Sequence, residues 1–580
     1  MKIPLKQYWA LFSTYLRPHR GRVLLLAVLI FGGIALQLVN PQLLRFFIDT
    51  ARARGSMNSL FAAAAIFIGV IVVQQVLAVA ATYFSENLAW TSTNALRHDL
   101  AAHCLGLDMG FHNTHTPGEL IERIDGDVTT LANFFSEFVL QVVGSGLLII
   151  GVLVVLFGVD LRIGSALTLY TVIVLLILNR LRGISIPHWI AGRQASAEMA
   201  GFLEERLAGT EDIRSSRAVD YVMRQFYVLM RQILLAYRRA HITGAVSSTI
   251  SRFSFSVGLA VGLGLGGYLY TQGAISLGTV YMVSYYTAIL SWPLFQITDQ
   301  IDDLQQAGAG LARINLLRAI PLSIDDGQGL RPPSARLAVT FDGVSFGYRA
   351  DEFVLRDVCF EVAPGCVLGL LGRTGSGKTT ISRLLFRLYD PQRGAIRLSG
   401  TDIRDMRLTD LRRRIGLVTQ EVQLFHASVR DNLTFFDRRV PDSEILEAIE
   451  QLGITAWYQS LPQGLDTPMR GGSGLSAGEA QVLALTRVFL KDPEVIILDE
   501  ASSRLDPATE RLIEHAVERL LRGRTAIIIA HRLGTVQRAD AIMVLSEGSV
   551  LEYGPRSTLA ADPHSHFAHL LRTGLELEAV

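Results

Sequence analysis

The residues with the clearest chemical potential form a glycine-rich loop that runs Gly372-Arg-Thr-Gly-Ser-Gly-Lys-Thr379. The apolar stretch Val367–Leu371 precedes it and a helical pattern follows from Thr380, so the loop connects a strand to a helix. Glycine lets the backbone wrap so that several N–H groups face phosphate oxygens, and the positive end of the helix points at the same anion. We expect Lys378 to neutralise the β- and γ-phosphates of a nucleotide and the Thr379 hydroxyl to ligate Mg²⁺.

Two acidic residues follow a second apolar segment, Val495–Leu498. In parallel sheets, ligand chemistry lies at the carboxyl edge of the strands, which is where Asp499 and Glu500 fall. Asp499 is suited to hold Mg²⁺, and Glu500 is suited to polarise a water for attack on the γ-phosphate. Taken alone, the pair is also compatible with two solvated acids after a strand; the phosphate-binding loop favours the catalytic interpretation.

A third apolar segment, Ile527–Ala530, ends at His531. A histidine at a strand end is often structural. Here it falls at the same expected sheet edge, so the sequence favours a contact between His531 and the γ-phosphate.

The elements that must position these residues belong to a chain of unusual composition. Of its 580 residues, 50% are hydrophobic and only 18% are charged, whereas soluble domains carry about 25% charged residues. A net charge of +1 argues against a broad nucleic-acid-binding surface. Three cysteines without metal-ligand spacing argue against a disulfide framework.

The apolar residues concentrate in six uncharged stretches of the first half. These are Val23–Leu44, Leu60–Phe84, Phe138–Val159, Ile163–Leu178, Phe253–Tyr270 and Leu277–Ile297. A helix needs about 20 residues to cross the hydrocarbon layer, and only the fourth stretch is short. Helix is required because a lone strand would leave its backbone polar groups unpaired in lipid. The stretches therefore predict six membrane-spanning helices.

The links between these spans are long on one side and short on the other. The segment before the first span carries Lys2, Lys6 and three arginines without an acid, which places the long-loop side in the cytoplasm. This segment lacks the small-residue cleavage site of a signal peptide. The first external link, with Arg45, Arg52 and Arg54 against a single acid, weakens the orientation argument. Six spans return the chain to the cytoplasm, where strands and helices alternate from about Leu337.

These motifs together resemble the ATP-binding cassette (ABC) family, specifically its exporters with six spans fused to one nucleotide-binding domain. Leu475-Ser-Ala-Gly-Glu479 is similar to the family's signature loop, and Gln420 lies in a segment similar to the loop that senses the γ-phosphate. Tyr348 matches the aromatic residue that stacks on adenine. The segment 503–506 is similar to the dimer-contact loop, and 117–123 resembles the first coupling helix. The resemblance covers nearly the whole chain.

The resemblance implies a fold class and a division of the chain. We expect an all-α six-helix transmembrane domain at 1–315, a linker at 316–336, and a cytoplasmic α/β P-loop NTPase domain at 337–580 with antiparallel β and α-helical subdomains. The implied cofactors are ATP and Mg²⁺. The residues expected to bind nucleotide are Tyr348, Gly372, Arg373, Thr374, Gly375, Ser376, Gly377, Lys378, Thr379, Thr380, Ser476, Gly478 and Glu479. The expected catalytic residues are Glu500, His531 and Gln420, and the expected metal ligands are Thr379, Gln420 and Asp499.

The resemblance also implies a dimer in which each ATP lies between the phosphate-binding loop of one chain and the signature of the other. This signature departs from the usual Leu-Ser-Gly-Gly-Gln at Ala477 and Glu479. Arg504 replaces the usual alanine of the dimer-contact loop, and Arg470 lies where an acid is common. These departures motivate the hypothesis that the partner is a different half-transporter and that one ATP site is weak; a homodimer remains the alternative.

The sequence as a whole predicts ATP-driven export of a hydrophobic or amphipathic substrate, which could be a lipid, a drug or a peptide, across a membrane that we expect to be the bacterial inner membrane. The alternatives are an ATP-gated or regulatory membrane protein that does not pump, and an importer, whose membrane and ATPase parts usually lie on separate chains. A soluble cassette ATPase of DNA repair or translation is incompatible with six spans.

Overall fold

A computed structural model describes residues 11, 13–332, 336–349, 352–419, 422–469, 475–499, 507–530 and 536–573. The chain forms two compact units. The first contains residues 1–105 and 117–320, and the second contains residues 106–116 and 321–580.

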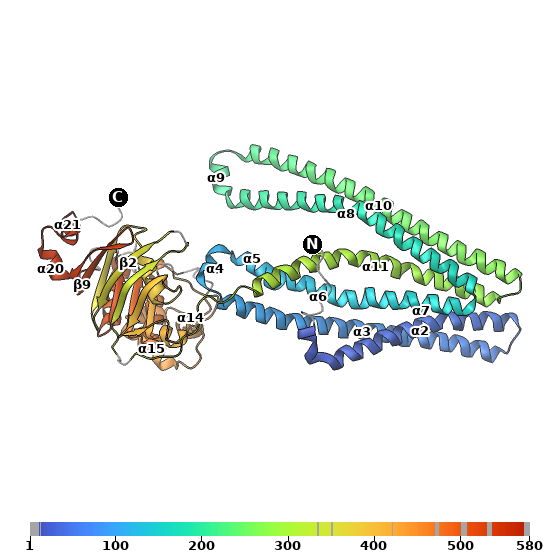
Figure 1. Cartoon of the computed structure of the whole chain (residues 1–580), viewed down its shortest axis with the longest axis horizontal. Coiled ribbons are helices and arrows are strands. Elements are labelled where there is room, and N and C mark those ends of the chain that lie inside the picture. The colour runs from blue at the N-terminus through green and yellow to red at the C-terminus, as the bar shows by residue number, and fades with distance from the viewer. Residues whose placement is uncertain are drawn as a thin grey trace. The chain divides into compact units, whose positions relative to one another are not determined.

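The first unit consists of helices. They are α2 (Arg20–Arg52), α3 (Met57–Gly106), α5 (Pro117–Ile121), α6 (Asp127–Glu137), α7 (Gly144–Val159), α8 (Leu161–Ala208), α9 (Thr210–Ser215), α10 (Val219–Thr271) and α11 (Leu277–Arg318). Two π-helical turns, η2 (Glu122–Gly126) and η3 (Phe138–Val143), lie on either side of α6. The long helices α8 and α10 pack side by side as an antiparallel hairpin closed by α9 (Figure 1).

All six predicted spans fall on helices of this unit. Five of the described helical stretches are long and apolar enough to cross a membrane, running from Ser13 to Arg52, Met57 to Gly106, Pro117 to Val159, Leu161 to Ala208 and Val219 to Thr271. The sixth predicted span is the first half of α11. The helices α3, α8, α10 and α11 extend well beyond their uncharged stretches, whereas α7 ends with its stretch at Val159.

Polar contacts fix how α11 packs against its neighbours. Asp49, near the end of α2, accepts hydrogen bonds from the Ser276 hydroxyl at 2.6 Å and the Gly278 backbone N–H at 2.8 Å, which caps the start of α11. Deeper in the unit, the buried Tyr286 donates its hydroxyl proton to the backbone carbonyl of Leu38 at 2.5 Å. The Tyr286 contact satisfies a hydroxyl that would otherwise lie unpaired in hydrocarbon.

Two sheets organise the second unit. The first is antiparallel, with the order β2-β1-β4-β5. The second has the order β10-β9-β3-β8-β7-β6, and its strands are parallel except for β10. The strands are β1 (Val339–Phe346), β2 (Leu355–Val362), β3 (Val367–Gly372), β4 (Arg393–Leu398), β5 (Thr401–Asp402), β6 (Ile415–Val418), β7 (Val495–Asp499), β8 (Thr525–Ile529), β9 (Ala541–Ser546) and β10 (Ser549–Pro555).

Helices cover the sheets and form a separate helical layer (Figure 1). They are α12 (Lys378–Leu385), α13 (Leu408–Arg414), α14 (Val429–Thr434), α15 (Asp442–Gln451), α16 (Thr455–Gln459), α17 (Ala477–Lys491), α18 (Pro507–Leu521), α20 (Arg556–Ala561) and α21 (His566–Thr573). The predicted fold class, a helical membrane domain followed by an α/β domain with mixed sheets, is therefore confirmed.

A short segment from the membrane half of the sequence belongs to the second unit. It contains α4 (Met109–Thr114), which begins at Asp108: this carboxylate accepts from the Phe111 N–H at 2.9 Å and from the Ser323 hydroxyl at 2.5 Å. Asn113 donates to the Tyr389 hydroxyl at 2.8 Å. The segment that packs with the nucleotide-binding elements is thus 106–116, whereas the residues that resembled the coupling helix, 117–123, belong to the membrane unit.

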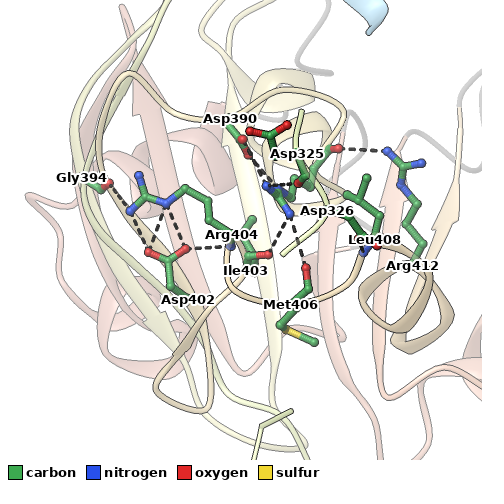
Figure 2. A network of polar contacts seen from close by, with 11 residues as sticks. Asp325, Asp326, Asp390, Gly394, Asp402, Ile403, Arg404, Met406, Leu408 and Arg412 are labelled. Carbon is green, nitrogen blue, oxygen red and sulfur yellow. Dashed lines mark hydrogen bonds and ion pairs between the residues drawn. The ribbon is translucent and has the colours of Figure 1, made fainter. Parts of the chain in front are cut away.

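The described residues that follow α11 are bound to the second unit by a polar network. Arg387, which is 2% exposed, donates to the Asp325 carbonyl at 3.0 Å and to the Asp390 carboxylate at 2.9 Å. The Leu408 N–H donates to the Asp326 carboxylate at 2.7 Å. Figure 2 shows Asp325 and Asp326 among these contacts. This part of the expected linker is held in place, because its carbonyls and carboxylates satisfy a buried guanidinium and a helix terminus.

Candidate nucleotide site

The topology of the six-stranded sheet brings the strands that precede the predicted site residues to end at one edge. Parallel strands end on the same side of a sheet. There, β3 ends in the glycine-rich loop, β7 ends at Asp499, and β8 and β6 end shortly before His531 and Gln420. Glu500, His531 and Gln420 themselves lie outside the described residues, as do the dimer-contact loop at 503–506 and Arg470.

The glycines of the phosphate-binding loop are required by its backbone. Gly375 and Gly377 have φ angles of +83° and +105°, which residues other than glycine rarely adopt. A Cβ on Gly377 would meet a Leu355 methyl at 2.5 Å, and one on Gly372 would meet the Leu545 carbonyl oxygen at 2.3 Å. The loop therefore keeps its curvature only with glycine at these positions.

Two buried polar side chains lie in this loop. Lys378 is 5% exposed, and its ammonium group donates to the Gly372 and Arg373 carbonyls at 2.6 and 3.0 Å. Ser376 is 4% exposed, and its hydroxyl has no hydrogen-bond partner among the described residues. A buried unpaired hydroxyl costs about 1–3 kcal/mol, which a phosphate oxygen would recover. This loop therefore fits a nucleotide phosphate.

Tyr348, the predicted adenine-stacking residue, is held at the edge of this loop. Its hydroxyl is 3.1 Å from the Thr380 hydroxyl and accepts from the Arg383 guanidinium at 3.1 Å. The ring makes an edge contact with Tyr389 at 5.3 Å between centroids and remains 42% exposed. An exposed, clamped aromatic ring is suited to stack on a base.

Arg383 and Tyr389 were missed by sequence reasoning. Arg383 lies on α12, which begins at Lys378, and Tyr389 follows that helix. Burial raises the pKa of the Tyr389 hydroxyl, and its neighbour Tyr348 raises it further, so it remains a neutral phenol at physiological pH. Nothing in the spacing of these residues indicates that they meet Tyr348, because β1 brings Tyr348 to them from a distant part of the chain.

Asp499, the predicted metal ligand, lies at the carboxyl edge of the six-stranded sheet. It is the last residue of β7, 7% exposed, and pairs in register with Ile529 of β8. Thr379, at the start of α12, is exposed. Mg²⁺ is commonly held by one or two protein oxygens together with phosphate oxygens and water. Such a site needs no protein-only cluster, and the described residues contain no group of three or more metal-binding side chains.

The signature helix α17 begins with a reciprocal pair of hydrogen bonds. The Glu479 N–H donates to the Ser476 hydroxyl at 3.2 Å, and the Ser476 N–H donates to the Glu479 carboxylate at 2.7 Å. This is a capping box, which the spacing Ser-x-x-Glu could have predicted. From the sequence, Glu479 is only a departure from the usual glutamine. In the structure, its carboxylate caps α17 by accepting the hydrogen bond of the Ser476 N–H.

The fold and this site define a P-loop nucleotide-binding domain fused to a membrane-spanning helical unit. Family models agree: the ABC transporter transmembrane region matches residues 23–294, and the ABC transporter domain matches residues 355–503. The chain belongs to the ABC transporter family as an exporter half-transporter, in which one membrane region is fused to one nucleotide-binding domain.

Relatives match along almost the full length. An ATP-dependent lipid A-core flippase of Pseudomonas aeruginosa is 30% identical, covering 99% of this chain and 97% of the relative. A putative multidrug export ATP-binding/permease protein of Bacillus subtilis, YgaD, is 28% identical, covering 96% and 98%. A solved structure of a bacterial Atm1-family ABC exporter with ATP bound has the same fold, with a TM-score of 0.80, 24% identity, and coverage of 97% and 99%.

Family membership confirms several predictions. The protein is a multi-pass integral membrane protein and an ATPase coupled to transport, and its nucleotide-binding domain binds ATP. Half-transporters of this family function as dimers. The protein is an ATP-driven exporter.

Proposed function

We propose that this chain forms one half of a dimer that exports a hydrophobic or amphipathic molecule by alternating access. The observation that carries the proposal is the loop in which buried Lys378 and the unpaired hydroxyl of Ser376 lie beside three glycines. A phosphate oxygen bound in this loop would give the Ser376 hydroxyl the hydrogen-bond partner that it lacks among the described residues.

Each residue of the site has a defined part in hydrolysis. Lys378 neutralises the β- and γ-phosphates, and Tyr348 stacks on adenine. Thr379 and Asp499 would hold Mg²⁺, which supplies charge stabilisation to the transferring phosphoryl group when bound. Glu500 accepts the proton of the attacking water, and the oxygen of that water forms a bond to the γ-phosphorus as the bond to ADP breaks.

Two further residues arrange the reactants. Gln420 orients the attacking water and would ligate Mg²⁺, and His531 donates a hydrogen bond to the γ-phosphate. The N-terminus of α17 in one half faces the γ-phosphate held by the other half, so a complete site needs two chains. Closing the paired domains on ATP switches the membrane helices from inward-open to outward-open, and hydrolysis resets them.

The partner and the membrane follow from the same proposal. The second half-transporter is a second copy of this chain or a related chain with a weaker site.

The named relatives suggest that a lipid or a drug is the cargo, since one is a lipid A-core flippase and another a putative multidrug exporter; a peptide is a third class. We place the protein in a bacterial inner membrane with the nucleotide-binding domain in the cytoplasm, as its bacterial relatives suggest.

The substitution Glu500→Gln tests the proposal. It keeps the shape of the side chain and removes the base, so we expect ATP binding to persist while turnover in lipid nanodiscs falls by about a thousandfold. Nucleotide binding and phosphate release measured on the same sample separate the two steps. Wild-type ATPase activity in the Glu500→Gln protein would contradict the assigned role.

A regulatory protein that binds ATP without pumping predicts a different outcome. In that case, transport in vesicles would continue at the same rate in the Glu500→Gln protein. Lys378→Ala provides the matched control, since it is expected to abolish nucleotide binding as well as turnover.

A further inference from the structure

The end of α2 carries positive charge that the proposed mechanism does not use. In the orientation proposed above, this end lies on the external face of the membrane, and it contains Arg45, Arg52 and Arg54 with Asp49 as the only acid. Counted over all three external links, four arginines stand against two aspartates, and no lysine occurs. Arginines in short external links oppose this orientation of the chain, so their presence indicates a function on this face.

Asp49 does not neutralise this charge. Its carboxylate accepts hydrogen bonds from the start of α11, and its one ion pair is with Arg45, whose Nε lies 3.8 Å away. Neither Arg52 nor Arg54, both of which are exposed, forms an ion pair with any side chain that the structure describes. Two guanidinium groups are therefore available to an anion from outside the chain.

Both arginines are held at the end of the helix. The Arg52 guanidinium lies over the Tyr270 ring of α10, 5.1 Å from its centroid, which leaves the N–H groups in the guanidinium plane available. Arg54 has a φ angle of +51°, in a turn that the Gly55 N–H closes on the Thr50 carbonyl at 2.9 Å. Glycine is usual at such a left-handed position after a helix. The negative end of α2 accounts for a cation in its last turn, but it does not account for arginine in place of glycine at this position.

An apolar groove lies deeper along the same helix. It is a cavity of about 230 Å³ between α2 and α3, lined by Leu43, Leu44, Phe47, Ala63, Ala64, Phe67 and Ile68. Phe47 and Ile68 are exposed, so the groove is part of the outer surface of the helical unit. Phe47 lies five residues before Arg52, about 7.5 Å along the helix axis. The polar layer on each side of a bilayer is about 5–8 Å thick, so acyl chains begin at the depth of this groove.

We propose that this end of α2 binds an anionic phospholipid of the external leaflet, with its phosphate on Arg52 and Arg54 and an acyl chain against the groove between α2 and α3. Guanidinium groups suit this ligand because their planar fork donates paired hydrogen bonds to phosphate oxygens. A zwitterionic lipid fits less well, because its ammonium group would lie near the same arginines. The lipid is bound at the membrane surface and is not the cargo; of the proposed function, only the orientation of the chain is used.

A fluorescent reporter beside the arginines measures the lipid preference. Bimane is attached to a cysteine introduced as Asn58→Cys, at an exposed position in the first turn of α3, into a full-length chain whose Cys104, Cys359 and Cys366 are replaced by serine. Phosphatidylcholine nanodiscs contain equal small fractions of doxyl-labelled phosphatidylglycerol or doxyl-labelled phosphatidylcholine, which quench bimane on contact. At low salt we expect about tenfold stronger association of phosphatidylglycerol, and at high salt a much smaller difference, because salt screens the attraction. Equal quenching by the two lipids at low salt would overturn the proposal.

Substitutions locate this preference at the end of α2. Arg54→Gly removes one guanidinium at a position where glycine fits, so the fold is preserved and the preference should fall about fivefold. Arg52→Gln should lower it by a similar factor. Arg162→Gln is the matched control, because Arg162 is an exposed arginine of a different external link, and it should leave the preference unchanged. An unchanged preference in both α2 variants, or an equal fall in the control, would refute the assignment.

Inorganic phosphate distinguishes a lipid from a free anion. Replacement of chloride by phosphate at constant ionic strength should leave quenching by phosphatidylglycerol unchanged, because the acyl chain holds the lipid against the groove. Displacement of the lipid by phosphate would assign the arginines to a soluble anion and overturn the proposal. All these measurements are made without ATP, so their failure leaves the export function intact. Wild-type ATPase activity in the Glu500→Gln protein would likewise leave the lipid site intact.

Discussion

At the scale of single residues, the nucleotide site depends on side chains that are positioned before ATP arrives. Tyr348 is an example: two polar partners and an aromatic neighbour fix its ring, which remains exposed on one side. Tyr348→Ala removes the stacking surface, worth about 1–3 kcal/mol, so KM for ATP should rise by about five- to a hundredfold. Tyr348→Phe keeps the ring and should raise KM only slightly. Equal KM values in steady-state ATPase assays of both variants would contradict adenine stacking.

Glu479 carries a second prediction at this scale. Its carboxylate caps α17 through the Ser476 N–H, and glutamine can make the same bond without the charge. Glu479→Gln should therefore preserve stability and lower KM for ATP by a few-fold, because an anion near the partner's γ-phosphate is removed. Glu479→Ala loses the capping bond and should destabilise the helix by about 1 kcal/mol. Thermal unfolding and ATPase assays of both variants check this; a raised KM in Glu479→Gln would contradict it.

At the scale of elements, the short helix α4 is the part of the membrane half that packs with the second unit. Partial burial opposes the charge of Asp108, but hydrogen bonds from Ser323 and from the Phe111 and Gly110 N–H groups hold its pKa below the usual value. A lowered folded-state pKa means that this carboxylate stabilises the folded state above its unfolded pKa, about 3.9. That contribution is lost as the pH falls through the lowered value.

Removal of the Asp108 cap should weaken the attachment of α4 to the rest of the second unit. Asp108→Ala loses both the α4 cap, worth about 1 kcal/mol, and the bond to Ser323, so ATPase stimulation by a transported molecule should fall several-fold. Asp108→Asn, which caps helices almost as well, should retain most of the stimulation. The ratio of stimulated to basal ATPase activity measures this stimulation. An unaltered ratio in the Asp108→Ala protein would contradict a role of α4 in the stimulation of ATPase activity by the transported molecule.

At the scale of the whole molecule, the sequence predicted the features that depend on local chemistry. The membrane spans were predictable because the stretch Val23–Leu44 and the five like it contain no charge. The phosphate-binding loop was predictable because Gly375 and Gly377 adopt positive φ angles that favour glycine. Features that depend on distant contacts were not predictable. The six residues of α4 carry too little periodicity to show which unit they join, and the contact between Tyr348 and Tyr389 arises only from packing.

The central claim is that ATP switches the side of the membrane from which the interior of the helical unit is accessible. The direct measurement labels a single cysteine, introduced as Gln74→Cys near the centre of the stretch Leu60–Phe84 into a Glu500→Gln chain whose Cys104, Cys359 and Cys366 are replaced by serine, with a membrane-impermeant maleimide. Inside-out and right-side-out vesicles report the two faces separately. We predict labelling from the cytoplasmic face without nucleotide, and from the external face with ATP and Mg²⁺. Labelling that ATP leaves unchanged on both faces would contradict the account.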